Sequence, residues 1–344
     1  MKIIVDAMGG DNAPGAIVSG ALMAAEEFQV DICLIGKGDE ILKALRDEGY
    51  DEIPPRIEIS HAQEVVEMDD DPSTVVRVKR NSSLVMGLKL LADGYADAFV
   101  SAGSTGAMLS GSTLTVKRIR GIRRAALAPI IPTSKGKAIL IDCGANIECT
   151  PEYMLQFAYM GSYYAERILG VPNPRVGLLN IGTEPTKGSD LQKDTYSLLT
   201  AAKEGGRLNF VGNVESRDVM FGVCDVVVSG GYSGNIFLKT MEGMGLLFVD
   251  MLRDLFGKNT KSKLSALLVR DGIRDLKKKM DYNETGGAPL LGIAKPVIKA
   301  HGSSKAYTLR SAIAQAIKYV ESGIIGEITK NIGFMRTDPE EKTE

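Results

Sequence analysis

The chain has 344 residues, 24% of them charged, and a formal net charge of −2 at pH 7. These values are typical of an ordinary globular protein and argue against a general nucleic-acid binder, which is usually basic as a whole. No apolar run reaches the ~18 residues needed to cross a bilayer, and we expect no secretory segment before the first predicted strand. The four cysteines lack zinc-site spacing, so we expect reduced thiols and a cytoplasmic location.

Each of six short apolar runs ends in a loop rich in Gly, Ser, Asp or Asn. Runs of this kind are typical of strands buried on both faces of a parallel sheet. Ligands bind along the edge of such a sheet where the strands end, so we expect the six loops to converge on one crevice. The strands and their loops are 2–5 with 6–11, 96–100 with 101–107, 137–141 with 142–146, 175–179 with 180–189, 223–228 with 229–235, and 296–300 with 301–304.

Helices and further strands are predicted between these runs. Asn12 and Pro14 favour a helix start, Asn81 is a candidate cap, and Gly94 and Gly323 are stop signals. In chain order we expect helices at 12–27, 40–48, 81–94 and 303–323, further strands at 30–35, 57–60 and 209–211, and an exposed acidic loop at 64–73.

Two neighbouring segments interrupt the alternation of strand and helix. Residues 240–256 and 262–281 carry apolar stripes at helical spacing and are joined by a polar tip, which predicts a helical hairpin. Between 257 and 280, eight Lys or Arg against two Asp give that stretch of the hairpin a charge of about +6. Residues 283–292 are expected to form a Gly-rich loop that returns to the sheet. We therefore expect a single α/β/α catalytic unit over 1–335, a basic amphipathic hairpin inserted at 240–282, and a polar tail at 336–344.

Several common catalytic motifs are missing from the sequence. It contains no G-x-G-x-x-G, no Walker A sequence and no G-x-S-x-G elbow. Only two histidines are present, His61 and His301, so a zinc hydrolase is not expected, and we interpret His61 as structural. The motifs call for no metal and no cofactor.

Two of the loops resemble anion cradles. Ser104 and Thr105 lie where a predicted strand gives way to a helix, and His301, Ser303 and Ser304 lie at a second such junction. Free N–H groups and the positive end of the helix dipole favour an anion at these places. Both loops therefore suit phosphate.

Lys187, Asn146 and Asn235 add one charge and two amide groups to the same set of loops. Phosphate is itself a nucleophile at neutral pH, so acyl transfer to it needs no Ser–His or Cys–His pair. The protein would then supply positioning and stabilisation of the tetrahedral oxyanion.

Structural interpretations of the same residues stay open. Lys187 can be a solvated loop lysine, and His301 can be a capping or core histidine. Asp6 and Asp142 can cap their loops, and Cys143 is more simply a small buried thiol than a nucleophile.

Seven motifs in this order resemble one family, the acyl-ACP:phosphate acyltransferases of bacterial phospholipid synthesis. They are DAMGGD, SAGSTGA, DCGAN, NIGTEPTKG, SGGYSGN, GAPLLG and HGSS, and the resemblance spans residues 1 to about 333. It implies transfer of a long-chain acyl group from acyl carrier protein to inorganic phosphate. It also implies a fold similar to the phosphotransacetylase and isocitrate/isopropylmalate dehydrogenase group, and a homodimer on the inner face of the membrane. The family usually has Asn where this chain has Ser104.

The resemblance and the loop chemistry together give a set of expected site residues. We expect Lys187, His301 and Asn235 to be catalytic, with His301 protonating the departing thiolate. The expected substrate- and phosphate-binding residues are Asp6, Ser104, Thr105, Gly106, Asn146, Asn180, Ser303 and Ser304. The residues expected to contact an anionic membrane or the carrier protein are Lys258, Lys261, Lys263, Leu264, Leu267, Leu268, Arg270 and Arg274.

Two other functions remain open at this stage. An NAD-dependent decarboxylating dehydrogenase of the same fold group would need a metal-binding Asp cluster, which the sequence does not display. A non-catalytic scaffold at the membrane surface would have no use for six convergent loops. The sequence does not separate lipid binding by the hairpin from carrier-protein binding.

Overall fold

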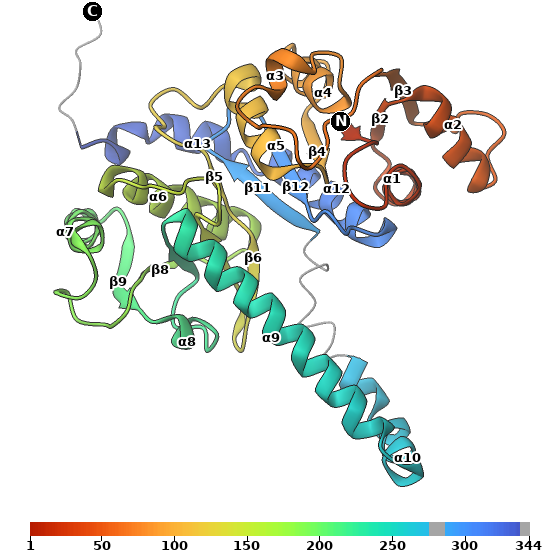
Figure 1. Ribbon diagram of the computed structural model, residues 1–344. Helices are drawn as coiled ribbons and strands as arrows, with labels where there is room; N and C mark the ends of the chain where they lie inside the picture. Colours follow the sequence, from red (N-terminus) through yellow and green to blue (C-terminus); the bar gives the residue numbers. More distant parts are fainter. Residues whose placement is uncertain (275–285, 338–344) are drawn as a thin grey trace, which may run out of the picture.

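The computed structural model describes residues 1–274 and 286–337, which form an α/β fold with two sheets (Figure 1). In the first sheet, β1 pairs parallel with β4, and β4 pairs parallel with β12. At one edge, β11 pairs antiparallel with β12, and β5 pairs antiparallel with β11. From edge to edge its strands are β3 (Ile57–His61), β2 (Asp31–Gly36), β1 (Lys2–Asp6), β4 (Ala98–Ser101), β12 (Val297–Ala300), β11 (Gly287–Leu291) and β5 (Ala126–Leu127).

The second sheet has five strands, of which only the edge strand β6 is antiparallel. Their order is β6 (Ile130–Thr133), β7 (Gly136–Ile141), β10 (Val226–Val228), β8 (Arg175–Leu179) and β9 (Asn209–Val214). We expected all six polar loops at the edge of one sheet. The strands that precede these loops belong instead to two sheets. The chain changes sheet between β5 and β6 at Pro129, which has no N–H to donate to a ladder.

Helices cover both faces of the first sheet. Side chains alternate along β1: Ile3 and Val5 join one buried cluster, whereas Ile4 joins another. The first face is covered by α1 (Gly15–Phe28), which packs on α12 (Ala306–Glu321), and the second by α4 (Ser83–Ala92). On the second sheet, α6 (Pro151–Ile168) packs on β7 and β10, and α7 (Asp190–Glu204) packs on α6. The short helices are α2 (Gly38–Asp47), α3 (Val75–Val78), α5 (Thr105–Gly111), α8 (Ser216–Val219) and α13 (Ile324–Lys330).

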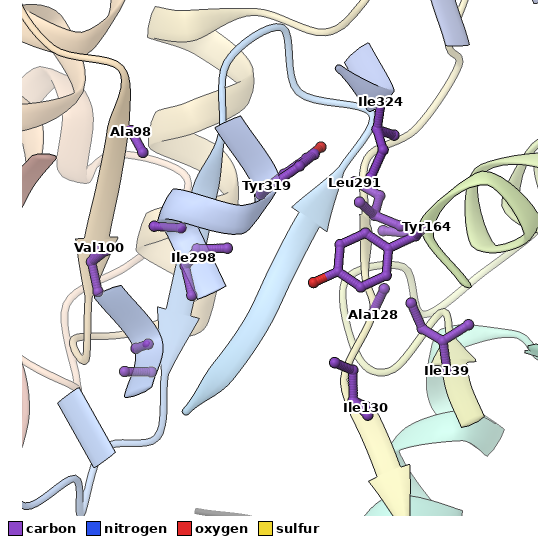
Figure 2. Packing of buried hydrophobic residues seen from close by; sticks show 14 of the residues in the cluster. Ala98, Val100, Ala128, Ile130, Ile139, Tyr164, Leu291, Ile298, Tyr319 and Ile324 are labelled. Atoms are coloured by element: carbon purple, nitrogen blue, oxygen red, sulfur yellow. The ribbon is translucent and has the colours of Figure 1, made fainter. Parts of the chain in front are cut away.

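One hydrophobic cluster joins the two sheets. Figure 2 shows Val100 and Ile298 from the first sheet and Ile139 from the second among its members. Tyr164 and Tyr319 lie between them, with ring centroids 5.9 Å apart at 76°. The Tyr164 hydroxyl accepts a hydrogen bond from Gln315 Nε2 at 2.9 Å. The shared core fixes the relative position of the two sets of strand ends.

Most of the elements predicted from the sequence are confirmed. All six strands that precede the polar loops are present, and the loop at 64–73 is largely exposed. The cap of α4 is Ser82 rather than Asn81, because the Ser82 hydroxyl accepts from the Val85 N–H. The expected loop at 283–292 is wrong where it is described: residues 287–291 form β11, and residues 283–285 lie outside the described part. Pairing with β12 and β5 overrides the local Gly and Pro signals.

The expected hairpin begins earlier than predicted. Helix α9 (Gly231–Gly257) has 27 residues and starts inside the predicted loop 229–235. Gly231 and Gly234, in the first turn of α9, allow the helix to pack closely against the loop after β7. A Cβ at Gly234 would lie 2.1 Å from the carbonyl oxygen of Asp142. Helix α10 (Thr260–Leu268) lies at the far end of α9, away from the sheets (Figure 1). Residues 275–281 of the predicted second arm lie outside the described part.

Within residues 1–274 and 286–337, no helix combines the length and the apolar content needed to cross a bilayer.

Candidate active site

A pocket of about 490 Å³ lies where loops from both sheets meet; we call it the strand-end pocket. Five of the six polar loops line it, so the predicted convergence is observed for those five. Within the described part of the chain, the sixth loop, 180–189, lies outside it. The polar lining is Asp11, Thr105, Cys143, Asn235, Lys239, Glu242, Lys299, His301, Ser303 and Thr308.

Lys299 brings a buried ammonium group to this pocket. It lies on β12 and is only 9% exposed. Its Nζ donates hydrogen bonds to the carbonyl oxygens of Ala102, at 3.2 Å, and Ala300. Burial lowers the pKa of the ammonium to about 8, against a smaller opposing effect of Asp11. The group is therefore cationic at neutral pH and poorly solvated, which favours an incoming anion.

His301 follows β12 and has a defined orientation. The Ser303 backbone N–H donates to His301 Nδ1 at 3.3 Å, and the Ser303 hydroxyl lies 2.8 Å from the same nitrogen. Since Nδ1 accepts the N–H, we assign the ring proton to Nε2. Burial, and next the charge of Lys239, lower the pKa of His301. The imidazole is therefore neutral at pH 7.

Helix α9 contributes a second cation and a carboxylate. Lys239 and Glu242 both line the pocket, and their side chains form an ion pair of 2.7 Å. Asn235, one turn earlier, lies beside the loop after β7, since a Cβ at Gly144 would be 3.5 Å from Asn235 Cγ. The first turns of α9 thus face the strand ends.

The remaining wall of the pocket is apolar. Its side chains come from the 64–73 loop, from the 127–130 segment and from α9. Leu238 and Met241 are three residues apart on α9 and so lie on the same face of the helix. The same stripe continues outward through Met244 and Phe248, which are 58% and 40% exposed. The apolar lining side chains are Met68, Leu127, Pro129, Ile130, Leu238 and Met241.

Asp6 holds together the loops that follow β1 and β4. Its carboxylate accepts hydrogen bonds from the Ser101 hydroxyl at 2.7 Å and from the Met8 N–H at 3.2 Å. Burial raises its pKa. A Cβ at Gly9 would lie 2.7 Å from the Gly103 nitrogen, so only glycine allows the loops after β1 and β4 to touch.

Asp142 organises the loop after β7. It is fully buried, and its carboxylate accepts from the N–H groups of Leu127, Cys143 and Asn146 at 2.7–2.9 Å. The Asn146 side-chain amide donates to Asp142 at 2.9 Å and to the Ala125 carbonyl at 2.8 Å. Asn146 faces a second cavity instead of the strand-end pocket. Burial raises the pKa of the Cys143 thiol, which is therefore not a thiolate.

The predicted site residues divide into two groups. Thr105, Asn235, His301 and Ser303 line the strand-end pocket. Of the rest, Asp6 and Asn146 have the structural hydrogen bonds described above. Ser104 caps α5 through the Ala107 N–H, Ser304 donates to the His301 carbonyl at 2.6 Å, and Gly106 lies against Pro72.

Lys187 and Asn180 lie on the loop after β8, outside the pocket among the described residues. The Asn180 amide donates to the Lys187 carbonyl at 3.1 Å, so Asn180 shapes this loop. The side chain of Lys187 is exposed. Among the described residues, neither of the two lines the strand-end pocket with His301 and Asn235.

The hairpin residues are exposed at the end of α9 and on the helical segment beyond it. Leu264 and Leu268 are 62% and 84% exposed, and Arg274 pairs with Asp271 at 3.2 Å. The Leu267 side chain lies outside the described side chains. Lys258, Lys261, Lys263 and Arg270 are exposed to solvent.

Sequence reasoning missed Lys299, Lys239 and Asp11 as pocket residues. Lys299 was counted as part of the apolar run 296–300, although a lysine inside a buried strand is a signal in itself, because lysine is almost never buried without a role or a partner. Lys239 fell between the predicted end of the 229–235 loop and the predicted start of the hairpin. Asp11 was interpreted as a loop residue and a candidate helix cap, not as a residue of the site.

The fold and the pocket define an α/β enzyme whose strand-end site offers cations and hydrogen-bond donors beside an apolar wall. The chain belongs to the family described as fatty acid synthesis protein, which matches residues 1–327. This confirms the resemblance inferred from the motifs. The phosphate acyltransferase of Caldanaerobacter subterraneus subsp. tengcongensis is 46% identical over 333 residues, or 96% of this chain and 97% of that relative. The phosphate acyltransferase of Desulfitobacterium hafniense is 47% identical, with 96% and 98% covered.

Solved structures show the same fold at lower identity. A phosphotransacetylase from Streptococcus pyogenes superposes with a TM-score of 0.62 and 17% identity, covering 93% of this chain and 94% of that one. A branched-chain phosphotransacylase from Enterococcus faecalis gives 0.58 and 15%, covering 94% and 100%. The predicted fold class is therefore confirmed.

No three His, Cys, Asp or Glu side chains within the described ranges come together in a way that could hold a metal ion.

Proposed function

We propose that the protein transfers an acyl group from a thioester to inorganic phosphate and so produces an acyl phosphate. The observation that carries the proposal is the strand-end pocket, where Lys299 and Lys239 share the lining with a set of apolar side chains. A site with both features suits a reaction that joins phosphate to a fatty acyl group. The relatives at 46–47% identity bear the name of this activity.

Phosphate binds, in this proposal, between Lys299 and the turn 301–303. The Lys299 ammonium is held by two carbonyl oxygens and has a third N–H to give. Thr105, on the 101–107 loop, and Ser303, within the turn itself, place hydroxyl groups in the pocket. Binding a dianion beside a partly desolvated cation stabilises both groups.

The chemical step is a single acyl transfer. A phosphate oxygen attacks the thioester carbonyl carbon, the C–S bond breaks, and the electron pair remains on sulfur. The proton of hydrogen phosphate finally resides on the departing thiol, so the reaction balances without a cofactor. In this proposal the Asn235 side-chain amide donates a hydrogen bond to the oxyanion of the tetrahedral intermediate. The N–H at His301 Nε2 donates a hydrogen bond to the leaving sulfur.

We assign the long-chain acyl group to the apolar stripe of α9. Leu238 and Met241 line the pocket, and Met244, Phe248 and Met251 continue the stripe with 58%, 40% and 60% exposure. An acyl chain that leaves the pocket along this stripe covers side chains that are otherwise in water. An acyl carrier protein is the donor that we propose.

The hairpin is proposed as the membrane contact. Its end presents the exposed Leu264 and Leu268 among Lys258, Lys261 and Lys263, a pattern suited to an anionic lipid surface. Each lysine near such a surface contributes about 1 kcal/mol. We place the protein at the cytoplasmic face of the membrane as a homodimer, the state that the family resemblance implies.

The other predicted site residues have supporting roles in this proposal. Asp6 and Ser104 set the positions of the loops after β1 and β4, and Ser304 closes the His301 turn. Lys187 attracts phosphate to this edge of the second sheet without touching it in the pocket. The dehydrogenase alternative is not favoured, because the named relatives are phosphate acyltransferases.

The test is direct detection of the product. Purified protein is incubated with palmitoyl-carrier protein and phosphate, and acyl phosphate is trapped with hydroxylamine as the hydroxamate. Hydroxamate that depends on phosphate supports the proposal. Liposome binding without turnover of any acyl donor would instead favour the scaffold.

A further inference from the structure

A second cavity of about 510 Å³ lies next to the strand-end pocket and contains two arginines. We call it the arginine pocket. The function proposed above makes no use of it. It is lined by Leu109, Thr113, Arg118, Arg124, Ala125, Ala145, Asn146, Ile147 and Glu148.

The two cavities share one wall. On the loop after β7, Cys143 and Gly144 line the strand-end pocket, whereas Ala145 and Asn146 line the arginine pocket. Helix α5 is divided in the same way, with Thr105 facing one cavity and Leu109, one turn later, the other. A group bound in the arginine pocket is therefore separated from the reacting groups by a single layer of chain.

The outer rim of the arginine pocket is strongly basic. Residues 117–124 read KRIRGIRR and carry five cations in eight positions. Of these five, Arg118 is half-buried and the other four are exposed. Among the described residues, Glu148 lines the pocket, Asp142 accepts from the Asn146 amide that lines it, and Glu152 pairs with Arg123 at 3.2 Å. The segment 117–124 itself contains five cations and no acidic residue.

This basic segment has a fixed conformation. The Arg123 N–H donates to Gln156 Oε1 at 2.8 Å, and Gln156 Nε2 donates to the Gly121 carbonyl at 3.1 Å. Ala294 N–H donates to the Lys117 carbonyl at 2.9 Å. Arg124 lies over the Tyr153 ring, 5.6 Å from its centroid. Cations held on a rigid loop lose little conformational freedom when a partner binds.

We propose that the arginine pocket and the segment 117–124 are the docking site for an acidic thioester-carrying protein. The inference rests on the proposed function, because it is the acyl donor that must place its thioester in the neighbouring pocket. Anionic side chains of the carrier pair with Arg118, Arg124 and the exposed cations of the rim. The carrier is thereby held against the shared wall, with its acyl thioester directed to the strand-end pocket.

The basic hairpin fits this role less well. Gly257, at the end of α9, is 22 residues beyond Asn235, which is about 33 Å at the rise of an α-helix. The arginine pocket, in contrast, adjoins the strand-end pocket directly. Figure 1 shows α10 well outside the sheets. The two basic regions therefore have separate tasks, with lipid at the hairpin and the carrier protein at 117–124.

The test compares two acyl donors on three forms of the full-length protein: wild type, Arg118→Glu/Arg124→Glu, and the control Arg46→Glu, which reverses an exposed charge on α2. One donor is palmitoyl-carrier protein, and the other is the palmitoyl thioester of N-acetylcysteamine, which has no protein part. The double variant is expected to raise the KM for palmitoyl-carrier protein at least about tenfold and to abolish its salt dependence. The KM values for phosphate and for the small thioester stay within about twofold of wild type.

Three results would overturn the proposal: an unchanged KM for palmitoyl-carrier protein, an equal loss with both donors, or the same rise in KM caused by Lys261→Glu/Lys263→Glu in the hairpin. If the double variant does not fold, the single variant Arg124→Gln, at an exposed position, replaces it. We then expect the KM for palmitoyl-carrier protein to rise about threefold. If wild type forms no acyl phosphate from either donor, the proposed function fails. Docking is then judged by titrating the carrier protein itself, and unaltered binding by the arginine variants rejects the site.

Discussion

The Nζ of Lys299 donates a hydrogen bond to the carbonyl oxygen of Ala102 at 3.2 Å. Lys299 lies on β12, and Ala102 lies just after the neighbouring strand β4, with Lys299 in register with Ser101. The contact therefore joins the 301–304 and 101–107 loops through one ammonium group. It leaves that group at the pocket surface with capacity for one more acceptor.

Lys299→Met should remove phosphate binding while keeping the fold. Met preserves most of the volume, and the variant no longer carries a poorly solvated charge. We expect kcat/KM for phosphate to fall by about two orders of magnitude, as is common when a preorganised donor is lost. The thermal midpoint should not decrease, because relief of the buried charge offsets two lost hydrogen bonds of about 1 kcal/mol each. Activity within threefold of wild type would remove Lys299 from the mechanism.

The pKa of Lys299, about 8, predicts a pH dependence of phosphate binding. The ammonium is charged below this pH, so the KM for phosphate should rise about tenfold for each pH unit above it. The wild-type profile is measured from pH 7 to 10, and the Lys299→Met profile should lack this rise.

The same pKa has a consequence for stability. Between about 8 and 10.5 the unfolded chain binds a proton at Lys299 that the folded chain does not. The contribution of this group to the free energy of unfolding therefore increases as pH rises, by up to about 3 kcal/mol over the whole window. Urea titrations of wild type and of Lys299→Met at pH 7 and 10 measure this contribution as the difference between their free energies of unfolding. A difference that shrinks with pH would contradict the assignment.

Lys187→Ala should have a much smaller effect than Lys299→Met. Lys187 is exposed on the 180–189 loop and lies outside the pocket within the described chain. We expect a two- to threefold rise in the KM for phosphate at low salt that vanishes at high salt, at a nearly constant kcat. A large fall in kcat would show that Lys187 reaches the reacting groups, as the sequence motif suggested.

Gly234→Ala should destabilise the protein through a clash inside the first turn of α9. The added Cβ would lie 2.1 Å from the Asp142 carbonyl oxygen. We expect a loss of about 2–4 kcal/mol in urea unfolding. Gly243→Ala on the same helix is the matched control, since among the described residues a Cβ there meets nothing within 4 Å. It should stabilise by about 0.5–1 kcal/mol.

Leu264→Gln/Leu268→Gln should weaken binding to anionic vesicles without changing turnover of a small soluble thioester. Both leucines are exposed at the end of the hairpin, so their loss costs little in the folded protein. Flotation with vesicles that contain an anionic phospholipid should show at least a tenfold weaker association. Undiminished flotation would assign membrane contact to another surface.

The strand ends could be predicted because each depends on a short, local signal. Val226, Val227 and Val228 followed by Ser229 and Gly230 identify a buried strand and its loop without knowledge of the partner strand. The chemistry of Thr105, His301 and Ser303 followed from their positions after such strands. These three residues line the observed pocket.

The features that the sequence concealed depend on contacts between distant segments. Gly231 and Gly234 are typical of a loop until the Asp142 loop is seen to press against them. Gly287 and Pro289 are typical of a return loop until pairing with β12 makes them a strand. Lys299 was hidden in an apolar run, because its role depends on carbonyl oxygens of the neighbouring loop.

The most direct test of the central claim uses phosphate in which all four oxygens are labelled with oxygen-18. The protein is incubated with palmitoyl-carrier protein and this phosphate, and the palmitoyl phosphate is analysed intact by mass spectrometry. If phosphate in the strand-end pocket attacks the thioester, the product carries all four labels, and Lys299→Met forms almost none of it. A product with three labels, or full activity of Lys299→Met, would contradict the account.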